Sequence, residues 1–287
     1  MSHIDARNTE SSHTAALPDD VRLDYLTQGE TGGRPVLFLH GYSDSCRSYK
    51  PVFEAMPRHI RLFAPSFRGH GDSSRPMQNY RTRDFSADIA AFIRGVHAGP
   101  MVVVGHSMGT AVAMRLAADH PELVGGLILI GAFATFNGHA DLVEFYRDVI
   151  SQLQDPVDEG FVREFQESTL ANPVAPGVLE SAIHESLKLS ADVWKQTGRG
   201  LFDDDFSDDL HRIRARTRVI WGDRDSMSPR ADQVHLVRAI PNATLSIHRG
   251  AGHAVHWENP DILVEELIAF LANEPDATRQ ASTAVIA

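Results

Sequence analysis

The chain has 287 residues, of which 43% are hydrophobic and 23% are charged, a composition typical of globular proteins. Its formal net charge of -11 excludes the basic surface that nucleic-acid binding requires, and its single cysteine excludes a disulfide within the chain. No stretch reaches the about 20 consecutive apolar residues of a membrane-spanning helix, and the N-terminal residues lack the apolar core of a signal peptide. We therefore expect a cytoplasmic protein that binds neither nucleic acid nor membranes. The ends of the chain, residues 1–20 and 274–287, are expected to be flexible tails.

Between these ends, short apolar runs alternate with helical patterns. Helical spacing of apolar residues predicts helices over residues 83–96, 111–118 and 261–271. This alternation indicates an α/β protein with a mostly parallel sheet flanked by helices. The apolar runs that predict buried strands are residues 36–39, 61–65, 101–104, 127–130, 219–221 and 244–247.

Residues 133–210 interrupt this alternation. They contain helix-like segments, such as residues 141–153 and 160–170, but no convincing buried strand. We expect this region to be an inserted helical cap that restricts a site and excludes water from it. The remaining residues, 21–132 and 211–273, are expected to form the α/β core.

The strongest chemical signal is the pentapeptide G-H-S-M-G at residues 105–109. It follows a predicted strand and opens a predicted helix, which is the context of a nucleophile elbow. Glycine is needed on both sides because the turn is tight and the serine backbone is strained. The sequence therefore predicts that Ser107 is a nucleophile and that the side chain of His106 points away from it.

A serine hydroxyl needs a base to take its proton and an acid to orient that base. Asp225 and His253 follow the predicted strands at residues 219–221 and 244–247, in the chain order serine, acid, histidine. Both lie at carboxyl ends of strands, where open α/β sheets place their sites. We therefore predict that Asp225 is the orienting acid and His253 the base.

Other residues nearby compete for these roles. Asp223 directly follows the same strand as Asp225, and we interpret it as a turn residue. His248 and His256 flank His253, and His256 is alternatively a partly buried packing residue beside Trp257.

The tetrahedral intermediate of acyl transfer requires two preorganised hydrogen-bond donors. One is expected to be the backbone N–H of Met108, the residue after the nucleophile. The other is expected to be the backbone N–H of Tyr42, because Gly41 lets the loop after residues 36–39 turn towards Ser107. A simple turn that ends the strand is the competing interpretation.

Together these motifs resemble the α/β-hydrolase superfamily, in the branch of esterases, lactonases, cofactor-free haloperoxidases, epoxide hydrolases and carbon–carbon bond hydrolases. The resemblance covers about residues 21–273 and implies the α/β-hydrolase fold with an inserted helical cap. Besides the elbow it rests on L-H-G-Y at residues 39–42, F-R-G-H-G-D-S at 67–73, W-G-D-R-D at 221–225, G-A-G-H at 250–253 and E-N-P at 258–260.

Within this superfamily, serine at the elbow implies acyl transfer, whereas dehalogenases and epoxide hydrolases carry aspartate there. The resemblance thus implies hydrolysis of a small carboxylic ester or lactone through an acyl-enzyme on Ser107, without a metal or other cofactor. Alternatives on the same triad are a carbon–carbon bond hydrolase and a cofactor-free perhydrolase. A small-molecule receptor with little turnover is an alternative of another class. The loop Y-S-D-S at residues 42–45 lacks the Gly-Pro-rich stretch of many carbon–carbon bond hydrolases.

Large apolar side chains are expected near the rim of the site, where they would form an apolar substrate pocket. For each of them, packing between cap and core is the competing interpretation. These residues are Phe133, Phe136, Trp194, Met227 and Trp257.

Overall fold

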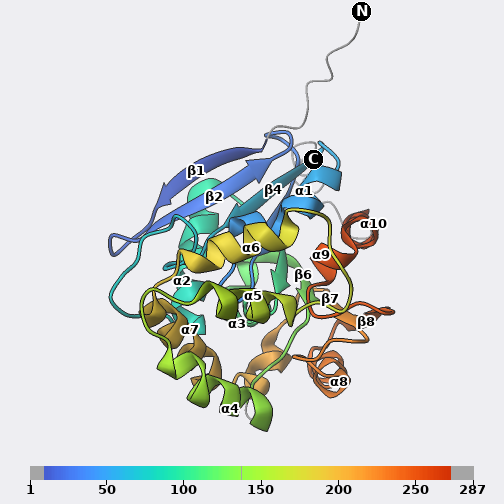
Figure 1. Ribbon diagram of the computed structural model, residues 1–287. Coiled ribbons are helices and arrows are strands. Elements are labelled where there is room, and N and C mark those ends of the chain that lie inside the picture. The colour runs from blue at the N-terminus through green and yellow to red at the C-terminus, as the bar shows by residue number, and fades with distance from the viewer. Residues whose placement is uncertain (1–9, 137, 273–287) are drawn as a thin grey trace, which may run out of the picture.

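Eight strands form one sheet in the order β1-β2-β4-β3-β5-β6-β7-β8, in a computed structural model that describes residues 10–136 and 138–272 (Figure 1). Neighbouring strands from β4 to β8 run parallel, whereas β1 and β2 are added antiparallel at one edge. The predicted mostly parallel sheet is confirmed. The strands are β1 (Ser11–Ala16), β2 (Arg22–Gln28), β3 (Arg34–Leu39), β4 (Ile60–Pro65), β5 (Met101–His106), β6 (Val124–Ile130), β7 (Thr217–Gly222) and β8 (Ala243–His248).

Helices cover both faces of the sheet because successive side chains of a buried strand point to opposite faces. In β3, Leu37 and Leu39 pack with α2 and α3 on one face, while Val36 and Phe38 pack with α1 and α10 on the other. The helices around the sheet are α1 (Lys50–Ala55), α2 (Thr82–Val96), α3 (Met108–Asp119), α8 (Arg230–Ala239), α9 (Val255–Glu258) and α10 (Pro260–Ala272). The described residues also form four short 3-10 helices: η1 (Cys46–Tyr49), η2 (Pro121–Leu123), η3 (Ile150–Gln152) and η4 (Ser207–Arg212). Within the described ranges, no helix combines the length and the apolar character that crossing a bilayer demands.

Four further helices lie between β6 and β7, and we call them the helical insertion. They are α4 (Ala140–Asp148), α5 (Glu159–Glu167), α6 (Val178–Leu187) and α7 (Ala191–Asp203). Figure 1 shows α5 and α6 lying across the front of the sheet, with α4 and α7 below and beside them. The buried residues Val162, Ile183 and Trp194 join the same hydrophobic cluster as α2 and α3. The insertion therefore packs continuously onto the core.

The prediction of a flexible tail over residues 1–20 is wrong for residues 11–16, which form β1. Ser11–Ala16 pairs in register with β2 and forms the edge of the sheet. Its side chains are nearly all exposed, so the strand has no apolar alternation that would reveal it in the sequence. Backbone hydrogen bonds to β2 hold it instead. Residues 1–9 and the tail expected at residues 274–287 lie outside the described residues.

Candidate active site

Ser107 lies in the sharp turn between β5 and α3, where it remains half-buried. Its φ of +50° falls in a region that residues other than glycine rarely adopt. Its N–H donates to the carbonyl oxygen of Ile130 (2.9 Å), which ties the turn to the end of β6. A β-carbon at Gly105 would lie 2.5 Å from the Gly109 oxygen, and one at Gly109 would lie 2.1 Å from the Leu39 oxygen. Close backbone contact therefore requires glycine on both sides of Ser107.

His253 and Asp225 form a buried hydrogen-bonded pair. The distance from His253 Nδ1 to Asp225 Oδ2 is 2.8 Å, and 3% and 0% of the two side chains are exposed. The other carboxylate oxygen, Oδ1, accepts the backbone N–H groups of Met227 (2.8 Å) and Ser228 (2.9 Å). These two donors hold the carboxylate with Oδ2 towards the histidine. On the far side of the ring, Nε2 is buried and has no hydrogen-bond partner among the described residues.

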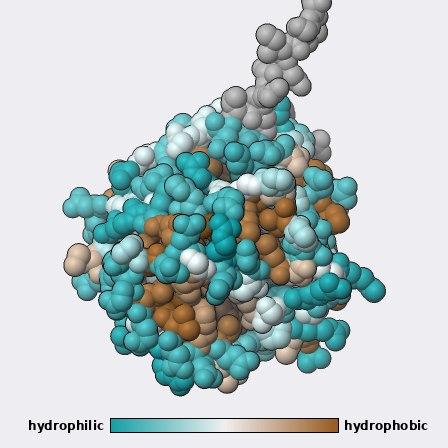
Figure 2. Space-filling view, in the orientation of Figure 1, coloured by the Kyte–Doolittle hydropathy of each residue, from teal (hydrophilic) through white to brown (hydrophobic). Residues whose placement is uncertain are grey.

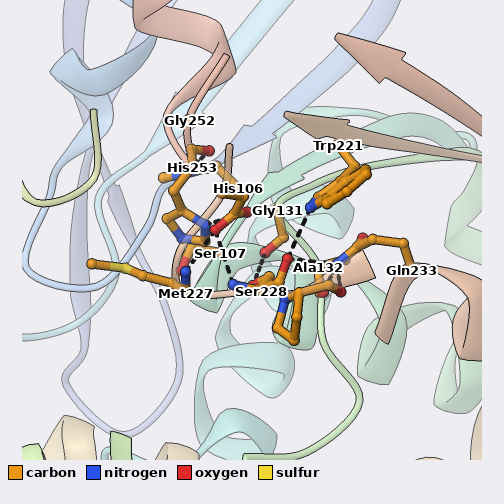
Figure 3. Close-up of polar contacts among 12 residues, drawn as sticks. His106, Ser107, Gly131, Ala132, Trp221, Met227, Ser228, Gln233, Gly252 and His253 are labelled. Carbon is orange, nitrogen blue, oxygen red and sulfur yellow. Dashed lines mark hydrogen bonds and ion pairs between the residues drawn. The ribbon is translucent and has the colours of Figure 1, made fainter. Parts of the chain in front are cut away.

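Gly131 brings His253 next to the elbow. It follows Ile130, the residue that accepts the Ser107 N–H. A β-carbon at Gly131 would lie 2.8 Å from both Nδ1 and Cε1 of His253. Ser107 and His253 therefore contact the same short stretch of backbone at the end of β6, and Figure 3 shows the two side chains in the same part of the site.

The residues that compete for these positions are engaged elsewhere. Asp223 Oδ1 accepts a backbone N–H of the loop after β8 (2.6 Å). His248 pairs with Glu266 (2.9 Å) at the outer edge of the sheet. His256 Nε2 faces the Ser48 hydroxyl (3.0 Å). None of the three hydrogen bonds includes Asp225 or His253.

His106 lies behind His253. Its ring centre is 4.9 Å from that of His253 and 4.3 Å from that of His256, and its Nε2 lies 3.2 Å from the His253 carbonyl oxygen. Burial lowers the pKa of His106 and lowers that of His256 to about 3, so both rings are neutral near pH 7. Although three histidines gather here, no group of three His, Cys, Asp or Glu side chains in the described part of the chain is arranged to hold a metal ion.

The two predicted oxyanion donors lie on adjacent segments. Gly109 packs against the end of β3, which brings the start of α3 next to the loop that follows this strand. Met108 is the first residue of α3, where N–H groups have no partner within the helix. Tyr42 lies inside a turn closed by the hydrogen bond from the Asp44 N–H to the Gly41 oxygen (3.3 Å). No described residue accepts the Tyr42 N–H.

The last residue of this turn, Asp44, has a buried carboxylate that no sequence motif indicated as part of the site. Its carboxylate accepts hydrogen bonds from Ser48 Oγ (3.2 Å) and from Gln166 Nε2 of α5 (3.1 Å). Burial raises the pKa of Asp44 to about 7, and the two hydrogen bonds only partly offset this effect. The one sequence signal was its place in Y-S-D-S, where many carbon–carbon bond hydrolases carry glycine and proline.

The helical insertion is also fastened to the loop that carries His253. The Thr169 oxygen, just after α5, accepts the His253 N–H (2.9 Å). Glu258 Oε1 accepts the N–H groups of Gly252 and Ala171, each at 3.0 Å. Glu258 belongs to the E-N-P segment of the sequence analysis, but nothing in that segment indicated a partner on the insertion.

The apolar residues predicted for a pocket come from several elements of the fold, and their role in a substrate pocket stays a prediction. Phe133 and Phe136 are buried and stack on each other, with ring centres 3.8 Å apart. Trp194 is fully buried on α7, and Met227 contacts Asp225 through its backbone. Of the five, only Trp257 lines a cavity of about 300 Å³ between α1 and α6. Apolar surface is exposed at the centre of the face that α5 and α6 cover (Figure 2).

Known proteins with a similar sequence or fold are hydrolases and peroxidases. A non-heme chloroperoxidase of Streptomyces lividans is 27% identical over 90% of this chain and 99% of that protein. A 2-(acetamidomethylene)succinate hydrolase of Mesorhizobium japonicum is 25% identical over 93% of this chain and 98% of that protein. An esterase from Exiguobacterium antarcticum has a similar fold, with a TM-score of 0.82, 20% identity, and coverage of 92% of this chain and 100% of that one.

A family model agrees with this resemblance. The model described as the alpha/beta hydrolase fold matches residues 34–260, which include the elbow, Asp225 and His253. The resemblance inferred from the sequence motifs is thus confirmed, and the chain belongs to the α/β-hydrolase fold family.

Proposed function

We propose that this protein is a serine hydrolase that cleaves a small carboxylic ester or lactone through an acyl-enzyme on Ser107. The observation that carries the proposal is the buried His253–Asp225 pair, 2.8 Å apart, beside the strained elbow. The acid engages Nδ1 and leaves Nε2 without a partner among the described residues, which is the arrangement that a general base requires.

In the first half of the reaction, Ser107 Oγ attacks the substrate carbonyl while His253 Nε2 takes its proton. The carbonyl oxygen becomes an oxyanion, which accepts hydrogen bonds from the N–H groups of Tyr42 and Met108. His253 then gives its proton to the leaving alkoxide, and the carbon–oxygen bond of the ester breaks. Asp225 stabilises the imidazolium that forms in between and holds the required tautomer.

In the second half, a water molecule attacks the acyl-enzyme while His253 takes one of its protons. The collapse of the second tetrahedral intermediate releases the carboxylic acid and returns the proton to Ser107 Oγ. No step of this reaction changes an oxidation state. His253 carries each proton between Ser107, the leaving group and water.

Perhydrolysis is a second candidate, favoured by the similarity to the chloroperoxidase of Streptomyces lividans. Hydrogen peroxide would replace water as the nucleophile on the acyl-enzyme, and the product would be a peracid instead of the acid. Adding hydrogen peroxide during acetate-ester turnover and measuring peracid separates the two outcomes.

The proposal is tested with a panel of short p-nitrophenyl esters and lactones, and with a fluorophosphonate that labels reactive serines. The wild type is expected to turn over many times and to gain the phosphonate mass at Ser107. Ser107→Ala should lose the label and more than about 1,000-fold of kcat. A folded wild type that neither turns over nor labels would overturn the proposal in favour of the receptor alternative.

A further inference from the structure

The loop after β3, residues 41–44, is held in a strained turn. Ser43 has φ of +64°, a left-handed conformation that costs energy for any residue except glycine. The hydrogen bond between Asp44 and Gly41 closes the turn around Tyr42 and Ser43. Such a conformation persists only when its surroundings hold it in place, so the groups that contact the loop decide where the Tyr42 N–H points.

Two helices of the insertion hold the second half of the loop. Gln166 Nε2 of α5 lies 3.1 Å from Asp44 Oδ1 and 3.3 Å from Ser43 Oγ. Ser186 Oγ of α6 donates to the Ser43 carbonyl oxygen (3.2 Å), and Gln166 also donates to this hydroxyl (2.8 Å). All four residues are buried. Because a buried polar group without a partner is costly, these contacts keep the loop and the insertion together.

A third helix holds Tyr42 by its side chain. The hydroxyl donates to the Trp194 carbonyl oxygen of α7 (2.5 Å), and the ring packs edge-on against Trp194, with centres 5.1 Å apart. Burial raises the pKa of Tyr42 above its usual value, so the hydroxyl remains a donor. Gly198 on the same helix makes room for the contact, since a β-carbon there would lie 3.1 Å from the Tyr42 hydroxyl oxygen.

The other oxyanion donor is placed in a different way. Met108 lies between Ser107, whose N–H donates to the end of β6, and Gly109, which packs against the end of β3. We infer that the sheet positions the Met108 donor while the helical insertion positions the Tyr42 donor, so that the Tyr42 hydroxyl and Gln166 are positioning residues for hydrolysis. This inference rests on the proposed function. It makes the insertion a part of the oxyanion hole in addition to a cover for the substrate.

The kinetic consequence is specific. The N–H of Tyr42 contacts the substrate oxygen most strongly when that oxygen carries negative charge, so displacing the N–H weakens transition-state binding more than substrate binding. Loosening the loop should therefore lower kcat and leave KM nearly unchanged. Loss of packing between the insertion and the core would instead alter substrate binding or thermal stability.

Two matched tyrosines provide the first test. Tyr42→Phe removes the hydrogen bond to the Trp194 oxygen, and Tyr146→Phe removes one to the Lys195 oxygen, the next carbonyl on α7 (3.2 Å). With the best p-nitrophenyl ester, Tyr42→Phe should lower kcat about 5- to 50-fold at nearly constant KM. The inhibition constant of phenylboronic acid, whose tetrahedral adduct carries a negative charge, should rise by a similar factor. Tyr146→Phe should leave all three quantities unchanged.

Two residues of α5 provide the second test. Gln166→Met removes the donor to Asp44 and Ser43, while Arg163→Met removes the exposed ion pair with Glu180 of α6 (2.8 Å). Only Gln166→Met should lower kcat, by about 10-fold, because only Gln166 reaches the loop. Thermal unfolding of each variant shows whether it is folded. If Gln166→Met does not fold, the comparison of Tyr42→Phe with Tyr146→Phe tests the inference by itself.

The outcomes separate this inference from the proposed function. If the wild type neither turns over nor labels at Ser107, the proposed function fails and the inference fails with it. If the wild type is active and labelled but Tyr42→Phe behaves like Tyr146→Phe, only the inference is overturned. A rise in KM without a fall in kcat would also overturn it.

Discussion

The loop after β7 and the loop after β3 each bury an aspartate near the candidate nucleophile, but different groups hold the two carboxylates. Asp225 receives two backbone N–H groups from its own loop and faces His253 with the remaining oxygen. Asp44 receives side-chain donors from Ser48 and from Gln166 on the helical insertion, in addition to a backbone contact with Gly41. The first acid is held by backbone groups within three residues of itself, and the second depends on a residue far along the chain.

The difference matters for what each acid can do. Backbone donors in a short loop stay where the fold puts them, so Asp225 is suited to orient a histidine through a proton transfer. Burial raises the pKa of Asp44 to about 7, and the hydrogen bonds that its carboxylate accepts offset this effect only in part. Asp44, the last residue of the turn that contains Tyr42, is therefore expected to change its charge near pH 7.

The largest effect is expected from Asp225→Asn. An amide in place of the carboxylate would stabilise the wrong tautomer of His253, and we expect kcat to fall about 1,000- to 10,000-fold with the fold intact. The matched variant is Asp223→Asn, because an amide oxygen can still accept the backbone N–H that Asp223 receives. Steady-state kinetics of the two variants provide the measurement. Equal losses in both would contradict the assignment of Asp225.

Gly131→Ala tests whether close packing of the His253 ring against Gly131 is needed for activity. Its β-carbon would lie 2.8 Å from the His253 ring at a φ of +60°, so the ring must shift. We expect kcat to fall by at least about 10-fold and the free energy of unfolding to fall by about 1–3 kcal/mol. Gly138→Ala is the control, since Gly138 also has positive φ (+97°) but nothing within 4 Å of the added carbon. Chemical denaturation and kinetics should show a stability loss in both variants and a loss of activity in Gly131→Ala alone.

Asp44→Asn tests the second acid through the pH dependence of stability. Burial raises the pKa of Asp44 from 3.8 to about 7, so between these values the folded protein keeps a proton that the unfolded chain has lost. Stability from the protonated carboxyl is full below about pH 4 and is lost as the pH rises through about 7. We expect the wild type to lose about 4 kcal/mol relative to Asp44→Asn between about pH 4 and pH 8, because a shift of about 3 pKa units corresponds to about 4 kcal/mol.

The groups that face Asp44 are His253, Tyr49, Ser48, Gln166 and the backbone of Gly41. All of them remain in the variant, so comparing the free energies of unfolding at each pH removes most of their own contribution. Parallel curves for the two proteins would show that Asp44 does not titrate in this range.

The smallest effect is expected from Arg199→Ala. Arg199 is 74% exposed and pairs with Asp203 one turn along α7 (3.2 Å). Exposed ion pairs contribute little, so the free energy of unfolding should change by less than about 0.5 kcal/mol. KM for a substrate that carries a carboxylate should not change either. A rise in that KM would place Arg199 at the substrate and refute this interpretation of it as a solvated residue.

Local patterns in the sequence were sufficient to predict most strands of the sheet. The apolar runs predicted β3 to β7 because strands buried on both faces need continuous apolar side chains, as in β5. A run also predicted β8, although this edge strand is partly exposed. The runs missed β1, whose exposed side chains carry no such pattern, and β2, in which polar residues interrupt the apolar ones. Ser107, Asp225 and His253 were predictable because each follows a strand and the strands meet at one edge. The substrate pocket had no comparable pattern in the sequence, so the residues expected to line it remain a prediction.

The sequence alone determined the α/β-hydrolase fold and the candidate nucleophile, because glycine spacing and apolar periodicity are read from residues close together in the chain. Only the tertiary structure decided what holds the loop after β3. Gln166 and Asp44 are 122 positions apart, and Tyr42 and Trp194 are 152 apart. Such contacts follow no local rule, since they arise from the way α5 and α7 pack over the sheet. The strained turn at Ser107 is therefore a local feature of the chain, whereas the placement of Tyr42 depends on the packing of the helical insertion.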